Sequence, residues 1–283
     1  MSELQGRVAF VTGASRGIGR AIARRFAAEG AAVVLGASRL GTHGKLRGTL
    51  EEAASEIQAA GGKAAALAAD LGDPEARKGL IERAAECFGP IDVLVNNAAA
   101  ARMVLPSQTT HADRLYMHEL NLNAPVDLAQ QALPAMRAAG GGWILNLTSA
   151  SATQPAVPYR DSREAALVIG AYGATKAALD RYTEALAHEL APERIYVNAL
   201  APVAIVLTEG AAYVRDIARK NPDMVEPVEM MAEAALALCT GSHVGRVIYS
   251  RDLLHALGRP VRSLDGSHVL GDAFLAADPE STV

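Results

Sequence analysis

The sequence predicts an α/β fold in which one doubly wound parallel sheet carries helices on both of its faces. Short apolar runs, typical of buried strands, alternate with stretches of helical periodicity from residue 8 onward. Such alternation gives a Rossmann-type sheet, whose ligands bind at the carboxyl ends of the strands. A glycine-rich turn after the first apolar run supports this prediction. With 283 residues, 50% of them apolar, the chain can bury a sizeable core.

The glycine-rich turn is Thr12-Gly13-Ala14-Ser15-Arg16-Gly17-Ile18-Gly19. It opens a segment in which Ile18, Ile22 and Phe26 recur every four positions, so it joins a strand to a helix. Glycines at such a turn let a phosphate approach backbone N–H groups at the positive end of the helix. The spacing Gly-x-x-x-Gly-x-Gly differs from the commoner Gly-x-Gly-x-x-Gly fingerprint. A tight strand-to-helix connection without a ligand is therefore the alternative.

Capping and breaking residues set the boundaries of the elements that follow. The first helix ends near Glu29, because Gly30 is a C-terminal capping signal. A capping box of Thr49 and Glu52 starts the second helix, and Asp73-Pro74 starts the third, since proline suits the first helical position. The predicted strands are 8–11, 32–35, 64–69, 91–95, 143–147, 196–200 and 247–249. After the first helix, the predicted helices are 49–60, 73–89, 110–139, 172–190 and 227–239.

Four regions depart from that regular alternation. The helix 110–139 is expected to bend or break near Pro125 and Pro134. Residues 40–48, rich in glycine, and residues 150–170, which lack periodicity, are predicted loop insertions near the adenosine end and the active site. Residues 250–283 form a C-terminal extension with no assigned element. Because no internal repeat or linker composition divides the chain, we expect a single domain over residues 1–283.

Composition and charge indicate which kinds of binding partner and which cellular compartment to expect. A formal net charge of −4 without basic clusters argues against nucleic acid. Cys87 and Cys239 lie far apart without metal-ligand spacing, so we expect no metal and a reducing, cytoplasmic setting. His188-Glu189 lacks the second histidine of a zinc-protease helix. The sequence shows no signal peptide and no apolar run long enough to span a bilayer, so no membrane partner is expected.

The residues after the second strand predict which dinucleotide binds. A carboxylate there would accept the ribose 2′-hydroxyl of NAD and repel the 2′-phosphate of NADP. The chain instead has Gly36-Ala37-Ser38-Arg39, and Arg39, Ser38 and Arg16 are all able to face a 2′-phosphate. We therefore expect NADP(H), with NAD(H) less favoured. The alternative is that both arginines are ordinary solvated side chains.

Tyr172 and Lys176 share one face of a predicted helix, because they are spaced i, i+4. A nearby lysine ammonium favours the phenolate and lowers the pKa of a phenol, which is about 10 in isolation. A serine at the end of an adjoining strand is able to bind the same substrate oxygen. The arrangement suits proton transfer to a carbonyl that is reduced by hydride. Taken alone, however, most Tyr-x-x-x-Lys pairs are surface neighbours.

The ordered set of motifs resembles the short-chain dehydrogenase/reductase family from residue 6 to about 250. The matching pieces are Thr12 to Gly19, Asp70-Leu71, Asn96-Asn97-Ala98, Asn121, Ser149, Tyr172-Gly173-Ala174-Thr175-Lys176 and Val197-Asn198-Ala199-Leu200-Ala201-Pro202. One piece would be weak, but the whole set in order is specific.

The resemblance implies roles for these residues. Tyr172 would be the general acid/base, Lys176 would lower its pKa and bind the nicotinamide ribose, and Ser149 would polarise the substrate oxygen. Asn121 would hold a relay water through its helix backbone. The implied cofactor contacts are Gly13, Ser15, Arg16, Gly17, Ile18, Gly19, Ser38, Arg39, Asp70, Leu71, Asn97, Ala98, Tyr172, Lys176, Pro202 and Val203. Asn146 would be structural.

The chain departs from the family pattern at several positions. Ala99 and Val203 stand where the family usually has glycine, and Leu207 occupies the usual place of a carboxamide-binding threonine, with Thr208 beside it. The methyl group of Ala99 should crowd the cofactor only slightly. The differences at Val203 and Leu207 put the nicotinamide contacts in doubt, not the fold. The spacing from Ser149 to Tyr172 is longer than usual. Ser151 or Ser162 is therefore an alternative to Ser149, which we prefer because it directly follows a strand.

Two function classes follow. The first is an NADP-dependent oxidoreductase acting on a carbonyl or secondary alcohol, either a 3-oxoacyl-thioester reductase or a broad ketone reductase. The second is a catalytically silent dinucleotide-binding scaffold or sensor, favoured only by Pro202-Val203. The resemblance also implies a homodimer or homotetramer that pairs the helices 110–139 and 172–190. The loops 150–170 and 203–226 would form the substrate pocket, so the sequence does not identify the substrate.

Overall fold

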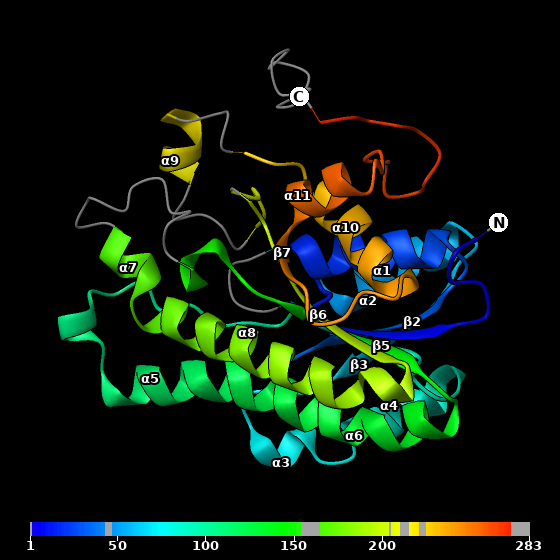
Figure 1. The fold of residues 1–283 in the computed structure, drawn as a ribbon, viewed down its shortest axis with the longest axis horizontal. Coiled ribbons are helices and arrows are strands. Elements are labelled where there is room, and N and C mark those ends of the chain that lie inside the picture. Colours follow the sequence, from blue (N-terminus) through cyan, green and yellow to red (C-terminus); the bar gives the residue numbers. More distant parts are fainter. Residues whose placement is uncertain are drawn as a thin grey trace.

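A computed structural model of the chain describes residues 2–42, 47–153, 165–203, 205–209, 215–220 and 225–272. The described residues form a parallel sheet in the order β3-β2-β1-β4-β5-β6-β7 (Figure 1). The strands are β1 (Val8–Thr12), β2 (Ala32–Ala37), β3 (Lys63–Ala68), β4 (Val93–Asn96), β5 (Gly142–Leu147), β6 (Ile195–Ala201) and β7 (Val247–Tyr249). The predicted doubly wound sheet and its strands are confirmed.

The strand order reverses at β1, the strand that begins the sheet in sequence. Phe10 of β1 is in register with Val34 of β2 on one side and with Leu94 of β4 on the other. In a doubly wound sheet, a crevice opens at the carboxyl ends of the two strands where the order reverses. The glycine turn after β1 and the segment after β4 therefore meet at this crevice.

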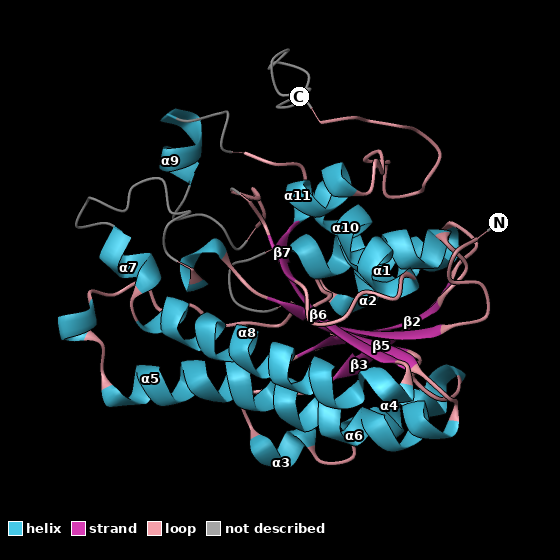
Figure 2. Cartoon of the chain, viewed as in Figure 1, coloured by secondary structure: helices cyan, strands magenta, loops and turns pink. Residues whose placement is uncertain are grey.

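Helices cover both faces of the sheet (Figure 2). One layer contains α1 (Gly17–Ala28), α2 (Leu50–Ala59), α10 (Val228–Thr240) and α11 (Ser250–Ala256). The other contains α4 (Leu80–Phe88), α6 (Ala124–Ala138) and α8 (Ala171–Leu190). Successive strand residues point to opposite faces, so Ala9 and Val11 of β1 join the first core while Val8 and Phe10 join the second.

The helix predicted over 73–89 is in fact two helices, α3 (Pro74–Arg77) and α4. Gly79 lies between them with a φ of +63°. This left-handed conformation interrupts the helical run, and glycine adopts it at little steric cost. The sequence signal for the start at Asp73-Pro74 was right, since the Asp73 side chain accepts a hydrogen bond from the Glu75 N–H.

The long helix predicted over 110–139 is interrupted near Pro125, as expected, but continues through Pro134. The first part, α5 (His111–His118), passes into α6 through a π-helical turn over Glu119–Asn123. Pro125 is the second residue of α6 and has no N–H to donate to a carbonyl of the preceding turn, so the regular hydrogen bonding is interrupted here. The wider turn contains Asn121, one of the predicted site residues.

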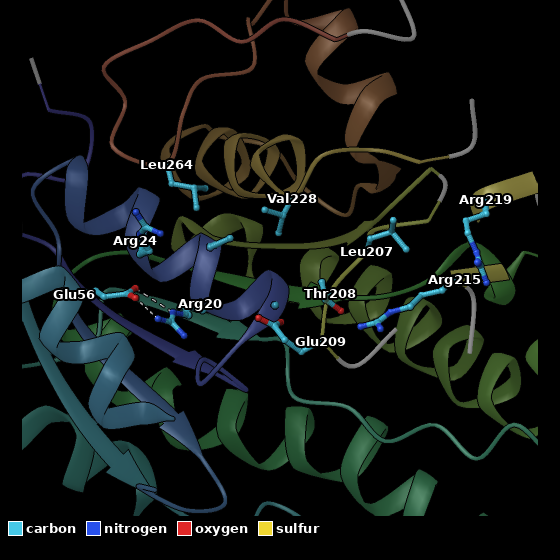
Figure 3. A pocket seen from close by; sticks show the side chains of 12 residues that line it. Arg20, Arg24, Glu56, Leu207, Thr208, Glu209, Arg215, Arg219, Val228 and Leu264 are labelled. Carbon is cyan, nitrogen blue, oxygen red and sulfur yellow. Dashed lines mark hydrogen bonds and ion pairs between the residues drawn. The ribbon is translucent and has the colours of Figure 1, made fainter. Parts of the chain in front are cut away.

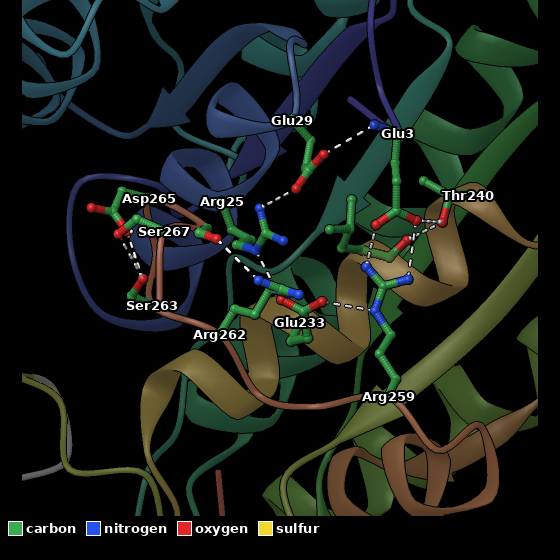
Figure 4. A network of polar contacts seen from close by, with 12 residues as sticks. Glu3, Arg25, Glu29, Glu233, Thr240, Arg259, Arg262, Ser263, Asp265 and Ser267 are labelled. Carbon is green, nitrogen blue, oxygen red and sulfur yellow. Dashed lines mark hydrogen bonds and ion pairs between the residues drawn. The ribbon is translucent and has the colours of Figure 1, made fainter. Parts of the chain in front are cut away.

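The extension after residue 250 contains order that the sequence did not predict. It includes α11, and it is tied to the first helical layer by a network of ion pairs centred on the buried Glu233 (Figure 4). Glu233 of α10 accepts from Arg25 Nε of α1 at 2.8 Å and from Arg259 Nε of the extension at 2.7 Å. Arg259 also pairs with Glu3 at 2.5 Å, and Arg25 pairs with Glu29 at 2.6 Å. The extension is thus fastened to both α1 and the N-terminal segment.

Parts of the predicted additions lie outside the described residues, namely 43–46, 154–164 and 273–283. Within the predicted loop 150–170, the chain forms α7 (Ala165–Ile169). Between β6 and α10 it forms α9 (Arg215–Lys220). In the part of the chain that is described, no helix is both long and apolar enough to cross a membrane.

Candidate active site

The glycine turn is shaped by the strand end beside it. Gly13 has a φ of +65°, and a Cβ there would lie 2.7 Å from Asn97 Nδ2, so no side chain fits. Asn97 Nδ2 donates to the Thr12 carbonyl at 2.9 Å. In return, Thr12 Oγ1 accepts from the backbone N–H groups of Asn97 and Ala98 at 3.0 and 3.1 Å. The Asn97 side chain therefore holds the turn in place. A Cβ at Gly19 would collide with the same amide.

A cavity of about 380 Å³ lies at the carboxyl ends of β1 to β4. Predicted cofactor residues that line it are Gly13, Ser15, Arg16, Ser38, Arg39, Asp70, Leu71, Asn97 and Ala98. Ala99, which replaces a family glycine, lines it as well. Gly17 and Ile18 lie at the start of α1 beside this cavity, with Ile18 packed partly into the core. The structure therefore brings together residues that are separated by more than 80 positions in the sequence.

The cavity holds two arginines near the end of β2. The Arg16 guanidinium donates through Nη2 to the Gly48 carbonyl at 3.2 Å. Its Nε is buried and has no acceptor among the described residues. Arg39 is exposed at the same cavity, and β2 is followed by Ser38 where an acidic residue would stand in an NAD site. Two guanidinium groups and a serine hydroxyl at one cavity suit a phosphate, so these residues fit a phosphorylated ribose.

Tyr172 and Lys176 lie one turn apart near the start of α8. Lys176 is 3% exposed, and its Nζ donates to the Leu147 carbonyl at the end of β5 at 2.7 Å. The same Nζ lies 5.9 Å from the centroid of the Tyr172 ring. Burial disfavours the ammonium and lowers the pKa of Lys176 to about 8, against the opposing charge of Asp180. The predicted Tyr–Lys pair is thus assembled, with its lysine fixed by the sheet.

Asp180 continues the same helical face one turn beyond Lys176. Its side chain is largely buried, and burial raises the pKa of its carboxyl to about 6 despite the nearby Thr148 hydroxyl and Lys176 charge. Neither Asp180 Oδ1 nor Thr148 Oγ1 reaches a hydrogen bond of ordinary geometry with any described residue. Sequence reasoning missed Asp180, although the spacing 172, 176, 180 would have placed it on the catalytic face.

Ser149 lies two residues after the end of β5, as the sequence predicted. Its Oγ accepts from the Ser151 N–H at 3.2 Å and from the Ser151 hydroxyl at 3.0 Å. Ser149 is half-buried, whereas Ser151 is 4% exposed. Because the Ser151 hydroxyl donates to Ser149 Oγ, the Ser149 hydroxyl is able to donate its own hydrogen to another acceptor. Ser162, the other alternative, lies outside the described residues.

Two buried asparagines lock the strands and α8 into place around these groups. Asn146 of β5 accepts from Asn96 at 2.9 Å and donates to Thr183 of α8 at 2.8 Å. Asn121 of the π-helical turn donates to the Ala100 carbonyl and accepts from the Ala100 N–H, both at 2.8 Å. Asn146 is structural, as expected. The Asn121 side chain is likewise committed to fixing the chain after β4.

The segment after β6 crosses from the sheet to the glycine turn. Pro202 and Val203 lie where β6 ends, and a Cβ at Gly17 would lie 3.2 Å from Thr208 Cβ. Leu207 is 50% exposed. Thr208 rather than Leu207 therefore faces the glycine turn. The Val203 N–H donates to Glu226 Oε2 at 3.1 Å, a contact that sequence reasoning missed because nothing near Glu226 signalled it.

A second cavity of about 910 Å³ lies on the other side of this segment, against α1 (Figure 3). Its lining includes Gly17 and Thr208 together with the arginines Arg20, Arg24, Arg215 and Arg219. Arg20 pairs with Glu56 of α2. The sequence did not predict this cavity. Among the residues that the structure describes, no three His, Cys, Asp or Glu side chains gather as metal ligands.

Comparison with known proteins extends these observations. The short chain dehydrogenase family model matches residues 7–218. Hydroxysteroid dehydrogenase-like protein 2 of Danio rerio is 34% identical over 294 residues, and the match covers 99% of this chain but only 66% of that protein. The chain thus spans slightly less than two thirds of the length of this relative.

Two solved structures share the fold at about the same level of identity. A 3-oxoacyl (acyl-carrier-protein) reductase from Agrobacterium tumefaciens with NADP bound has a TM-score of 0.73 and 32% identity, covering 87% of this chain and 93% of that one. A 7α-hydroxysteroid dehydrogenase complexed with NADH has a TM-score of 0.75 and 30% identity, covering 87% and 93%. Two proteins that are about equally similar to this chain thus hold different dinucleotides, and their names point to different substrates.

Proposed function

Because this chain belongs to the short-chain dehydrogenase/reductase family of NAD(P)-dependent oxidoreductases, we propose that it transfers hydride between NADP(H) and a carbonyl or secondary-alcohol substrate. The observation that carries this proposal is the buried Lys176 ammonium beside the Tyr172 ring. The pair lies at the carboxyl edge of the sheet, where the glycine turn and the nucleotide cavity also lie. A proton donor and a dinucleotide site at one edge suit reduction of a carbonyl.

When bound, NADPH supplies the hydride that reduces the carbonyl carbon. Tyr172 donates its phenolic proton to the carbonyl oxygen, and the resulting phenolate regains a proton from water. A phenol with a pKa of about 10 is a weak acid at neutral pH. The positive charge of Lys176 stabilises the phenolate and so lowers that pKa. Oxidation of an alcohol is the reverse, with the Tyr172 phenolate accepting the proton.

Ser149 orients the substrate oxygen in this proposal. Both donors of Ser151 point at Ser149 Oγ, so the Ser149 hydroxyl hydrogen is free to point at the substrate. Asn121 is assigned to hold a relay water through its backbone, at the π-helical turn where helical hydrogen bonding is rearranged. Each residue then acts on the proton or on the substrate oxygen.

NADP rather than NAD is proposed because of the charges in the nucleotide cavity. Arg16, Ser38 and Arg39 would hold the 2′-phosphate, with the buried Arg16 Nε as one donor. We assign Asp70 and Leu71 to the adenine, and Asn97 and Ala98 to the adenosine ribose. Gly13, Ser15, Gly17, Ile18 and Gly19 would border the diphosphate. Pro202 and Val203 are assigned to the nicotinamide side, where Thr208 supplies a hydroxyl near the glycine turn.

The substrate class is proposed as a ketone or a 3-oxoacyl thioester. The competing proposal, a dinucleotide-binding scaffold without turnover, draws only on Val203 in place of glycine. Ser149 follows β5, and Lys176 beside Tyr172 donates to the Leu147 carbonyl at the end of the same strand, which favours the enzyme. We also propose a homodimer or homotetramer that pairs α5 and α6 with α8, and a reducing cytoplasmic setting that suits the free cysteines Cys87 and Cys239. A monomeric mass in solution scattering would contradict the oligomer.

The test is oxidation of NADPH and of NADH with a panel of ketones, quinones and 3-oxoacyl thioesters. Turnover that prefers NADPH is expected for the wild-type protein, and its loss in Tyr172→Phe would support Tyr172 as proton donor. Clearly better turnover with NADH would contradict the roles of Arg16, Ser38 and Arg39. Tight NADPH binding without turnover of any substrate would favour the scaffold.

A further inference from the structure

The segment between β6 and α10 leaves the sheet at Pro202 and returns at Glu226. Its two ends are joined, since Ile205 and Val225 form a parallel bridge. The Glu226 N–H also donates to the Ile205 carbonyl at 3.0 Å. The described part that follows Ile205 crosses to Gly17 of the glycine turn through Thr208. The geometry of the joined ends therefore helps to set where residues 205–209 lie beside the turn.

Glu226 holds those ends with its side chain as well as its backbone. Its Oε2 accepts from the Val203 N–H at 3.1 Å, and its Oε1 accepts from the Ser250 hydroxyl at the start of α11 at 2.8 Å. Glu226 is 1% exposed, so a potentially charged side chain is buried to make two hydrogen bonds. A buried carboxyl group is costly unless its acceptors are used. Here both oxygens are used, and one of them fixes the backbone at Val203.

Charged groups of α11 and of the residues beyond it also face Glu226. Arg251 favours its ionised form, and Asp272 opposes it. These two side chains pair with each other at 2.6 Å. The net effect, dominated by burial, raises the pKa of Glu226 to about 7. The carboxyl therefore changes charge within the neutral range, while its two hydrogen-bond donors stay in place.

We propose that Glu226 is a positioning residue for the dinucleotide, acting through Val203 and Ile205 to hold residues 205–209 in place beside the glycine turn. The inference rests on the dinucleotide site of the proposed function. Glu226 itself lines neither described cavity near the turn, so its effect is indirect. Removing it should release the Val203 backbone and let the segment shift. Dinucleotide affinity would then fall, although every residue that lines the nucleotide cavity remains.

The test compares dinucleotide binding by wild-type protein, Glu226→Gln and Asp252→Asn, measured by calorimetric titration with NADPH. In Glu226→Gln the new amide keeps one acceptor, but its NH2 group faces a donor that the carboxylate had accepted from. The Kd should therefore rise about tenfold, the cost of a lost hydrogen bond and an unpaired buried donor. Asp252→Asn makes the same change of charge at an exposed position of α11 and should leave the Kd unchanged. Thermal unfolding shows whether each variant is folded.

If Glu226→Gln does not fold, Ser250→Ala takes its place. That change removes one partner of Glu226 and keeps its bond to Val203, so a smaller rise in Kd, about threefold, is expected. A folded Glu226→Gln with the wild-type Kd would overturn the inference while leaving the proposed function intact. Failure of the wild-type protein to bind either dinucleotide would overturn both.

Dependence on pH separates positioning from a purely structural role. The wild-type Kd for NADH should rise as the pH falls from 8 to 6, through the pKa of about 7, because protonation removes one acceptor. NADH is the probe here because it lacks the 2′-phosphate, which titrates near pH 6 itself. Glu226→Gln should show a flatter profile. A variant with the same pH profile as the wild type would contradict the inference.

Discussion

Two buried clusters of charge in this protein are built in opposite ways. In the network that fastens the C-terminal extension, Glu233 is paired with both Arg25 and Arg259 through separate oxygens. At the candidate active site, Lys176 and Asp180 are also buried, but no ion pair joins them, and Asp180 Oδ1 has no hydrogen-bond partner in the described part of the chain. The ion pairs of the first cluster link elements that are distant in sequence. In the second cluster, Lys176 and Asp180 are buried without forming an ion pair, so their charged forms cost free energy in the folded state.

The difference separates structural charge from functional charge. Paired buried charges satisfy each other, so removing one partner leaves the other exposed to the full cost of burial. Unpaired buried groups instead shift their pKa values toward neutrality, which is useful for moving protons. The pKa of Lys176 is lowered to about 8, and that of Asp180 is raised to about 6. Lys176 lies beside Tyr172, so under the proposed function the second cluster is the one that takes part in the chemistry.

The largest expected effect comes from Tyr172→Phe. The change removes the proposed proton donor and should lower kcat about 10²- to 10⁴-fold, with little change in dinucleotide Kd. Tyr182→Phe, on the same helix and away from Lys176, is the matched control and should retain activity. Steady-state kinetics with NADPH measures both. If Tyr172→Phe and Tyr182→Phe had the same kcat, Tyr172 would not be the proton donor.

In the structural network, Glu233→Gln should destabilise the protein by about 3 kcal/mol, the lower end of the cost of breaking a buried ion pair from one side. The change removes the carboxylate that Arg25 and Arg259 share, but Arg25 keeps Glu29 and Arg259 keeps Glu3. Chemical denaturation measures the free energy of unfolding, and kcat of the folded fraction should be unchanged. If Glu233→Gln had the same free energy of unfolding as the wild type, the ion-pair network would not stabilise the fold.

The same kind of change at the other cluster should have the opposite sign. Asp180→Asn should stabilise the protein by about 1–3 kcal/mol at pH 8, because it removes a carboxylate whose burial is poorly compensated. The Asp180 pKa is raised from 3.8 to about 6, so the folded state binds more protons than the unfolded state between these values. Its contribution to stability is present below about pH 4 and is lost as the pH rises through 6.

Unfolding measured at pH 4.5 and at pH 8 checks this sign. Asp180→Asn should gain most over the wild type at pH 8 and least at pH 4.5. Glu189→Gln, at an exposed position near the end of α8, is the control and should show no such trend. A variant that is less stable than the wild type at pH 8 would show that Asp180 is structurally paired after all.

The smallest expected effect extends the comparison to the nucleotide cavity. Arg16→Met removes a buried Nε that has no acceptor among the described residues, so it should weaken NADPH binding about tenfold and NADH binding much less. Arg20→Met, which removes an arginine of α1 that pairs with Glu56 of α2, is the control. Calorimetry gives the Kd values. An equal loss for both dinucleotides would place the 2′-phosphate elsewhere.

The parallel sheet was readable from the sequence because its strands are nearly continuous apolar runs bounded by glycine and capping signals. Tyr172, Lys176 and Ser149 were readable because a helix and a strand end fix where such residues lie. Glu226 was not readable, since its contact with Val203 depends on how the segment between β6 and α10 closes. The break at Gly79 and the ion pairs of Arg259 likewise depend on tertiary contacts, which carry no local pattern.

The central claim is that Tyr172 and Lys176 move a proton while hydride passes to a carbonyl carbon. The most direct measurement uses NADPH deuterated at nicotinamide C4, on the face that transfers, with a ketone that the protein reduces. Mass spectrometry should find one deuterium on the carbinol carbon with wild-type protein and almost none with Tyr172→Phe, although both bind the dinucleotide. Dinucleotide binding without label transfer to any carbonyl, or equal transfer by both proteins, would contradict the claim.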